Sequence, residues 1–279
     1  PRLSFFFCCT MEFFEEIAKF RAARRIYARI MRDKFHAKNA KSWHLRFHVQ
    51  TSGESLTAQQ VDNNIVRVTT EALAAVLGGC QSLHTNSRDE ALALPTEESV
   101  KIALRTQQII ATETGLTKTV DPMAGSYYVE YLTNRIEEEV EKYLKKIERI
   151  GGALFAVEKG FFQDEIRKNA YALKKEIDDN KRIIVGVNKF QDPDGAEPKL
   201  NAMDIEIEGR QIARLKDFKN SRDRIKVEQA LNALQKASEN PDENLIPHII
   251  HAVKSCVTLG EISSTLVGVF GRYEPRISF

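Results

Sequence analysis

Near its start the chain contains a short stretch, RFHVQTSG at residues 46–53, in which apolar and polar positions alternate. Side chains of a strand alternate between its two faces. Such a strand therefore has one apolar and one polar face, formed by Phe47, Val49 and Thr51 and by Arg46, His48 and Gln50. The polar face indicates that this side of the sheet contacts something other than a hydrophobic core.

The flanking sequence predicts alternating strands and helices. The hydrophobic period gives a strand at residues 1–9, a helix at 11–31, the strand just described, a helix at 57–77, a strand at 80–87 and a helix at 96–114. Thr57 and Gln60 fit a capping box for the second helix, which Gly78 and Gly79 would end. This order and spacing are typical of parallel βα units.

The second half of the chain is predicted to be mostly helical. Its pattern gives helices at residues 128–150, 163–178, 221–238, 244–256 and 259–270, a short strand at 182–187 and a polar loop at 191–199. We therefore predict a βα region over residues 1–115 and a helical region over residues 116–279.

Charge and composition exclude several classes of partner. The 41 basic and 39 acidic residues nearly balance, so neither nucleic acid nor a membrane is expected to bind through bulk charge. No apolar run approaches the roughly 20 residues of a membrane-spanning helix. The basic residues of helix 11–31 are interpreted as a solvated face, with guidance of an anionic ligand as the alternative: Lys19, Arg21, Arg24, Arg25 and Arg29.

The cysteines and the start of the chain give two further expectations. The four cysteines include no CxxC pair, which favours a reducing, cytoplasmic setting. The chain begins with PRLSFFFCC rather than with Met, so we expect additional sequence upstream of Pro1.

Polar residues follow two of the predicted strands at their carboxyl ends, where parallel βα folds bind ligands. His48, Gln50 and Gly53 belong to the first strand and its turn; His84, Thr85, Asn86, Asp89 and Glu90 belong to the second. A glycine directly beyond a strand also allows a flat ligand to approach the backbone. These positions predict a binding site at one rim of the sheet.

Two other interpretations of these residues remain open. His48 and His84 could be hydrogen-bonded histidines of the core. His48, Cys80 and His84 could bind a metal, although the strand rise separates Cys80 from His84 by about 13 Å, which disfavours a shared ion. Motifs of nucleotide-binding folds, zincins and serine hydrolases are absent.

Longer strings carry a resemblance to a known family. PRLSFFF, FHVQTSGESLTAQQ, QSLHTNSRDEALALPTEESVKIALRTQQII, DPMAGSYYVE and IVGVNKF resemble consecutive segments of the large catalytic chain in the methylmalonyl-CoA mutase family of cobalamin-dependent acyl-CoA mutases. The resemblance is nearly continuous to about residue 190. It implies an α/β fold, the C-terminal part of a (β/α)8 TIM barrel followed by a mostly helical region.

The resemblance also implies site residues. Arg2 and Ser4 would contact the CoA tail; Gln50, Gly53, Glu90 and Ala93 would line adenosylcobalamin, with His48 and His84 in supporting roles. The family residues that contact the acyl group would lie upstream of Pro1. Three positions depart from the family pattern, since Cys80, Arg88 and Ala93 stand where Thr, Phe and Gly are usual.

The implied reaction is the radical interconversion of succinyl-CoA and methylmalonyl-CoA. The cobalt-ligating signature DxHxxG is absent from this sequence, so the resemblance implies that a separate cobalamin-binding domain or small subunit provides that ligand. The N-terminal half of the barrel is a further expected partner. Two alternatives remain: an isobutyryl-, hydroxyisobutyryl- or ethylmalonyl-CoA mutase, and a non-catalytic fragment that acts only in assembly.

Overall fold

The computed structural model describes residues 2–192, 200 and 206–274, which divide into two compact units, residues 1–201 and 202–279. This division differs from the predicted boundary between residues 115 and 116, because a long helix that follows residue 116 packs against the first helix of the chain. Most of the predicted loop at 191–199 lies outside the described residues.

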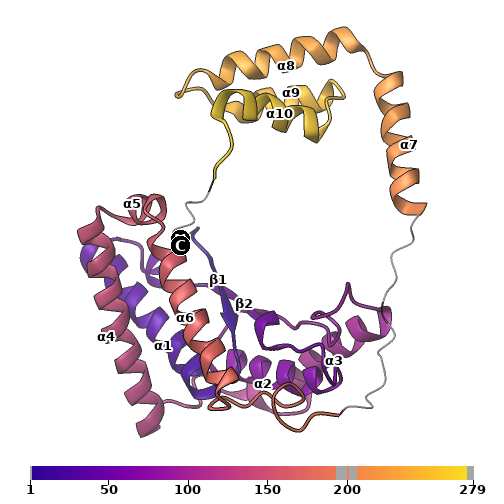
Figure 1. Ribbon diagram of the computed structural model, residues 1–279. Helices are drawn as coiled ribbons and strands as arrows, with labels where there is room; N and C mark the ends of the chain where they lie inside the picture. Colours follow the sequence, from indigo (N-terminus) through magenta and orange to yellow (C-terminus); the bar gives the residue numbers. More distant parts are fainter. Residues whose placement is uncertain (1, 193–199, 201–205, 275–279) are drawn as a thin grey trace. The chain divides into compact units, whose positions relative to one another are not determined.

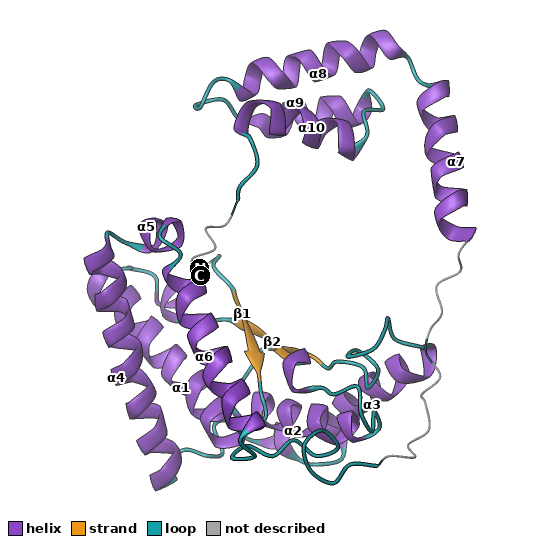
Figure 2. Cartoon of the chain, viewed as in Figure 1, coloured by secondary structure: helices purple, strands orange, loops and turns teal. Residues whose placement is uncertain are grey.

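The first unit contains a small parallel sheet with strand order β1-β2-β3 (Figure 2). Its elements alternate along the chain as β1 (Phe5–Cys9), α1 (Phe13–Arg29), β2 (Phe47–Thr51), α2 (Asn63–Leu77), β3 (Ser82–His84) and α3 (Glu97–Thr112). Short helical turns at Ile30–Lys34, Ala40–Trp43, Gly53–Ser55 and Leu116–Lys118 connect them. The prediction of parallel βα units is confirmed.

One face of this sheet is covered by α1 and α2. Phe47 and Val49 of β2 are buried, together with Cys9 of β1. The ring of Phe20 from α1 stacks on that of Phe47 at 5.4 Å, and Phe7 meets Phe47 edge-on at 5.3 Å. The apolar side of the alternating stretch is therefore the core side, which leaves its polar side facing away from the helices.

After α3 the first unit continues with α4 (Tyr127–Ile150), α5 (Ala153–Glu158) and α6 (Phe161–Asp178). Figure 1 shows α4 lying beside α1, and the two helices pack together. Gly151 ends α4 in the left-handed region at φ 113°, a conformation that favours glycine. The predicted helices at 128–150 and 163–178 are confirmed, whereas α5 was not predicted.

Three of the five basic residues of α1 lie at this helix contact, and Lys19 and Arg24 donate to the carbonyls of Cys8 and Gly78, so the interpretation of the run as a solvated face is wrong. Arg21 donates to Asp121 at 2.9 Å and to Glu130 at 2.7 Å, and its side chain is only 11% exposed. Arg25 and Arg29 both pair with Glu137 of α4. The pKa of Glu130 is lowered to about 2 by its hydrogen bond from Arg21. Arg21, Arg25 and Arg29 therefore bind α4 to α1.

The predicted start of α2 is also wrong. The helix begins at Asn63 rather than near Thr57, and Gln60 adopts a left-handed φ of 47°, which a right-handed helix over residues 57–77 could not contain. Asn64 instead closes the preceding turn, since its side chain accepts from the Thr57 amide and donates to the Thr57 carbonyl. The end is as predicted, because Gly78 follows Leu77 and Gly79 has a φ of 80°.

The apolar stretch at residues 182–187 forms a turn instead of the predicted strand. Asn188 accepts a hydrogen bond from the Ile184 amide at 2.7 Å and donates to the carbonyls of Ile177 and Arg182. Only an isolated bridge joins Val185 to Lys189. A side chain thus satisfies the backbone groups that a neighbouring strand would have satisfied.

The second unit is helical, with α7 (Glu206–Ser221), α8 (Arg224–Ser238), α9 (Leu245–Lys254) and α10 (Leu259–Phe270). Its core contains Val227, Ala230, Leu234, Ala252, Val257 and Ile262. The three predicted helices here are confirmed; α7 was not predicted. No helix among the described residues is both long and apolar enough to cross a membrane.

Candidate functional site

The face of the sheet away from α1 and α2 presents two rows of side chains across the strands. Strand register places Phe6 beside His48 and His48 beside Ser82 in one row. In the next row Gln50 lies between Cys8 and His84, nearer the carboxyl ends of the strands. Phe6 is 61% exposed although its neighbours Phe5 and Phe7 pack against the core. This polar and partly aromatic face is the side predicted to contact a ligand.

His48 is fixed within its row by contacts on both sides. Its ring lies 5.3 Å from the ring of Phe6, and its Nδ1 shares a hydrogen bond of 2.8 Å with the Ser82 hydroxyl. It is therefore held on the open face rather than in the core, which argues against the interpretation as a core histidine. His84 is exposed on the same face.

The rim at the carboxyl ends of β2 and β3 is held by an amide network. Gln50 Nε2 donates to Asn86 Oδ1 at 3.0 Å. Asn86 is 2% exposed; its backbone amide donates to Thr51 Oγ1 and its Nδ2 to the Thr51 carbonyl, each at 2.9 Å. Thr51 was assigned to the core side, so its part in orienting Gln50 was missed. Thr51 is the last residue of β2, and this position beside the rim could have indicated its role.

Gly53 and Glu90 approach each other at this rim. A Cβ added at Gly53 would lie 3.0 Å from Glu90 Oε1 and 3.5 Å from Asn86 Nδ2. Loss of solvent raises the pKa of Glu90, His84 opposes that rise and Asp89 adds to it. Glycine at position 53 thus leaves open a space bordered by a carboxyl group and an amide.

Asp89 was predicted to line the rim, but its side chain instead forms hydrogen bonds at the start of α3. It is 3% exposed, and its Oδ2 accepts from Ser99 Oγ at 2.7 Å and from the Thr96 amide at 3.1 Å. Thr96 also caps α3 through the Ser99 amide. Asp89 therefore joins the loop after β3 to the start of α3, which fixes the turn that carries Glu90.

The remaining predicted residues divide between the two ends of the sheet. Ala93 is half-buried and follows Glu90 in the same turn, where its amide donates to the Asp89 carbonyl at 3.0 Å. Arg2 and Ser4 are exposed and precede β1, so they lie at the amino end of that strand. The structure brings Gln50, Gly53 and Glu90 together but places the predicted CoA residues at the opposite end.

The metal alternative is not favoured by the contacts of its members. Cys80 packs against the hydrophobic core, and His48 bonds to Ser82. In the part of the chain that the structure describes, no three His, Cys, Asp or Glu side chains gather as metal ligands would.

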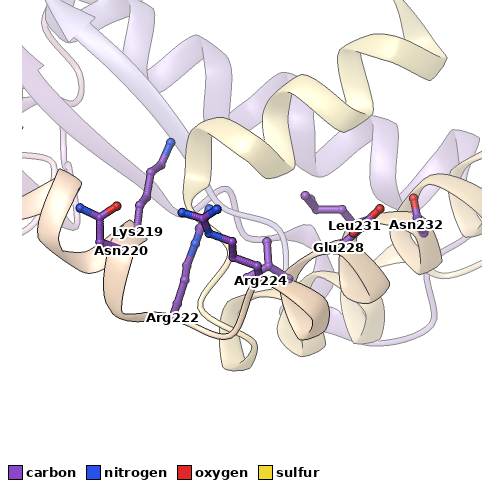
Figure 3. Close-up of a pocket in the computed structure, with 8 residues that line it drawn as sticks. Lys219, Asn220, Arg222, Arg224, Glu228, Leu231 and Asn232 are labelled. Atoms are coloured by element: carbon purple, nitrogen blue, oxygen red, sulfur yellow. The ribbon is translucent and has the colours of Figure 1, made fainter.

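The second unit contains a basic hollow between α7 and α8. Figure 3 shows Lys219, Arg222 and Arg224 around a cavity of about 400 Å³ beside α8. Arg222 is paired with Glu261, with Nη1 and Oε2 2.7 Å apart, and also donates to the Cys256 carbonyl. Its charge is thus used within the fold, so the rim of the sheet remains the candidate site.

Comparisons with known proteins give one consistent family. The family model for methylmalonyl-CoA mutase matches residues 1–272. The chain is 43% identical over 274 residues to the 2-hydroxyisobutanoyl-CoA mutase large subunit of Aquincola tertiaricarbonis, covering 98% of this chain and 49% of that protein. It is 45% identical over 275 residues to mitochondrial methylmalonyl-CoA mutase of Mus musculus, covering 98% and 37%.

A bacterial relative gives a similar match. Identity to methylmalonyl-CoA mutase of Escherichia coli is 44% over 274 residues, covering 98% of this chain and 38% of the relative. The chain thus spans about half, or less, of the length of these relatives.

Proposed function

The chain belongs to the methylmalonyl-CoA mutase family, and from this membership we propose that it is part of the large subunit of an adenosylcobalamin-dependent acyl-CoA mutase. The proposed reaction is the interconversion of succinyl-CoA and methylmalonyl-CoA by carbon-skeleton rearrangement, which makes the complete protein an isomerase. The observation that carries this proposal is the family match over residues 1–272, and the rim at which Gln50, Gly53 and Glu90 meet supports it.

The proposed fold is the C-terminal part of a (β/α)8 barrel. Three parallel strands in sequential order, with α1 and α2 packed on the face that carries Phe47 and Val49, support it. β1 and β3 each pair with a single strand among the described residues, so each has an edge that further strands of a barrel would cover. The upstream half of the barrel, from the same polypeptide or a partner, would enclose the face that carries Phe6 and His48.

The rim residues fit a large planar cofactor. Glycine at position 53 keeps the space beside Glu90 open, and the Thr51–Asn86 network orients the Gln50 amide before any ligand arrives. Gln50, Gly53, Glu90 and Ala93 would hold adenosylcobalamin, with its cobalt ligand supplied by a separate cobalamin-binding subunit. When bound, this cofactor supplies the radical that starts the rearrangement.

The chain's own residues would bind, orient and exclude water. Gln50 and Glu90 would provide polar contacts, while His48, fixed between Phe6 and Ser82, would line the enclosed face. Arg2 at the opposite end would attract the phosphates of CoA, with Ser4 as a hydrogen-bonding neighbour. We also place the protein in the cytoplasm, since its four cysteines are free thiols.

The test is reconstitution of the complete protein with a cobalamin-binding small subunit and adenosylcobalamin. Conversion of succinyl-CoA to methylmalonyl-CoA should occur in the mixture. Q50A should weaken cobalamin binding by about tenfold through loss of an oriented polar group, whereas E97Q, an exposed change in the first turn of α3, should leave it unchanged. Failure of the wild-type mixture to bind acyl-CoA and cobalamin would favour the assembly-only alternative.

A second substrate is favoured by one comparison. The relative of which this chain covers the larger share, 49%, is a large subunit that bears the name 2-hydroxyisobutanoyl-CoA mutase. Parallel assays with succinyl-CoA, 2-hydroxyisobutanoyl-CoA, isobutyryl-CoA and ethylmalonyl-CoA would separate these activities. Turnover of 2-hydroxyisobutanoyl-CoA without turnover of succinyl-CoA would replace the first proposal with this one.

A further inference from the structure

A carboxyl group lies in the interior directly below the rim. Glu71 projects from α2 with 0% exposure, and neither of its carboxyl oxygens has a hydrogen-bond partner among the residues described. An unpaired carboxylate is among the costliest groups to bury, so such a side chain is usually neutral or has a specific role. None of the site residues named above explains its presence.

The surroundings of Glu71 connect it to the end of β2. The Cys9 thiol donates to the Glu71 backbone carbonyl at 3.1 Å, and the Ser52 amide donates to the Cys9 carbonyl at 2.8 Å. The Ser55 hydroxyl and the Ser52 amide lie close enough to lower the pKa of the Glu71 carboxyl, although neither forms a hydrogen bond of normal geometry with it. Glu71 therefore lies under the turn Gly53–Ser55, which carries Gly53 at the rim.

Burial and neighbouring charges set the protonation of this group. Burial raises the pKa of Glu71 to about 7; Ser55 and Ser52 oppose the rise, as does Arg67, and the charge of Glu16 adds to it. Glu16 of α1 is itself paired with Lys19. Burial also raises the pKa of the Cys9 thiol of β1, which keeps that group neutral.

Arg67, one turn earlier on α2, does not neutralise Glu71. Its guanidinium donates to Thr57, to Asn64 and, at 2.8 Å, to the Val185 carbonyl. No ion pair between Arg67 and Glu71 is present in the described part of the chain. The carboxyl therefore has no cation in contact to hold its charge.

We propose that Glu71 is a proton-dependent positioning residue for the Gly53–Ser55 turn. As a neutral acid it stays buried and leaves the turn in place; as a carboxylate without a hydrogen-bond partner it draws in water and displaces the turn. Because a Cβ at Gly53 would lie only 3.0 Å from Glu90, displacement of this turn changes the space available at the rim. The consequence for cofactor binding rests on the proposed function, but the motion of the turn does not.

Hydrogen exchange in the complete protein tests the inference without any cofactor. Amide exchange over residues 52–56 is measured at pH 6 and pH 8 and corrected for intrinsic exchange rates. Protection in the wild type should fall on the order of tenfold, following the neutral fraction of Glu71. E71Q, which is uncharged at every pH, should remove this dependence, and E16Q, the matched change at the neighbouring acid, should preserve it.

The outcomes separate the inference from the proposed function. Protection that is independent of pH in the wild type would overturn the inference, even if E71Q failed to fold. The same pH dependence in E71Q as in the wild type would also overturn it. A titration with adenosylcobalamin and the small subunit is run in parallel; if the wild type binds no cobalamin while exchange depends on Glu71, the proposed function fails and the inference stands.

Discussion

Substitution of Phe20 by alanine should weaken the packing of α1 against the sheet. Phe20 is fully buried, stacked on Phe47 at 5.4 Å and edge-on to Phe7 at 6.0 Å. Loss of a buried phenyl group costs about 2–3 kcal/mol of transfer free energy, and each aromatic pair adds about 0.5–1.5 kcal/mol. The free energy of unfolding should therefore fall by about 3–5 kcal/mol, the range typical of Phe→Ala in cores.

The assay must report on this region rather than on the whole protein, since long chains with several units do not unfold in one step. Native-state hydrogen exchange of the β2 amides gives the local free energy of opening. Glu15→Ala is the matched control on the same helix, because Glu15 is exposed, and it should cost less than about 1 kcal/mol. Equal losses for the two variants, or a loss below about 1 kcal/mol for F20A, would refute the packing argument.

Four further changes test other contacts. G78A should destabilise α2 by about 1–3 kcal/mol, since its Cβ would lie 2.5 Å from Phe20 Cδ2, and by clearly less in an F20A background. R21M should lower the melting temperature and cost about 1–2 kcal/mol, because the acids it pairs with are more than one-third exposed. N188A should speed proteolytic cleavage at residues 182–190, as three hydrogen bonds are lost. Burial raises the pKa of Glu71 from 4.5 to about 7. The free energy of unfolding of the wild type should therefore fall by about 3 kcal/mol as the pH rises from 4.5 to 7, and then level off. Denaturant titrations of E71Q should show no such dependence on pH.

The regular elements could be predicted from the sequence wherever one side of an element packs on a core. The alternation at residues 47–51 and the helical period at 128–150 both follow directly from burial of one face. Glycines gave the ends of α2 and α4 because a left-handed residue follows each helix. The parallel arrangement followed from the order of these elements.

The wrong predictions have a common physical cause. Side chains form hydrogen bonds to groups that are distant in the sequence or lie in irregular backbone, and a local pattern does not show such partners. Asn64 closes the turn that the sequence assigned to a helix cap, and Asn188 bonds to one amide and one carbonyl of the segment assigned to a strand, those of Ile184 and Arg182. The partners of Arg21 lie 100 and 109 residues away, beyond the reach of any local pattern. At the rim, Gln50 and Glu90 were identified as neighbours, but the support from Thr51 depends on the register between strands.

The contact between α1 and α4 has a consequence for biosynthesis. Arg21 leaves the ribosome about 100 residues before Asp121, which at about 5–20 residues per second is a delay of about 5–20 s. During that interval the arginines that face α4 lack their partners, and that side of α1 is exposed to solvent. The nascent chain therefore passes through a defined period in which α1 lacks its partner helix, and that period ends when α4 emerges.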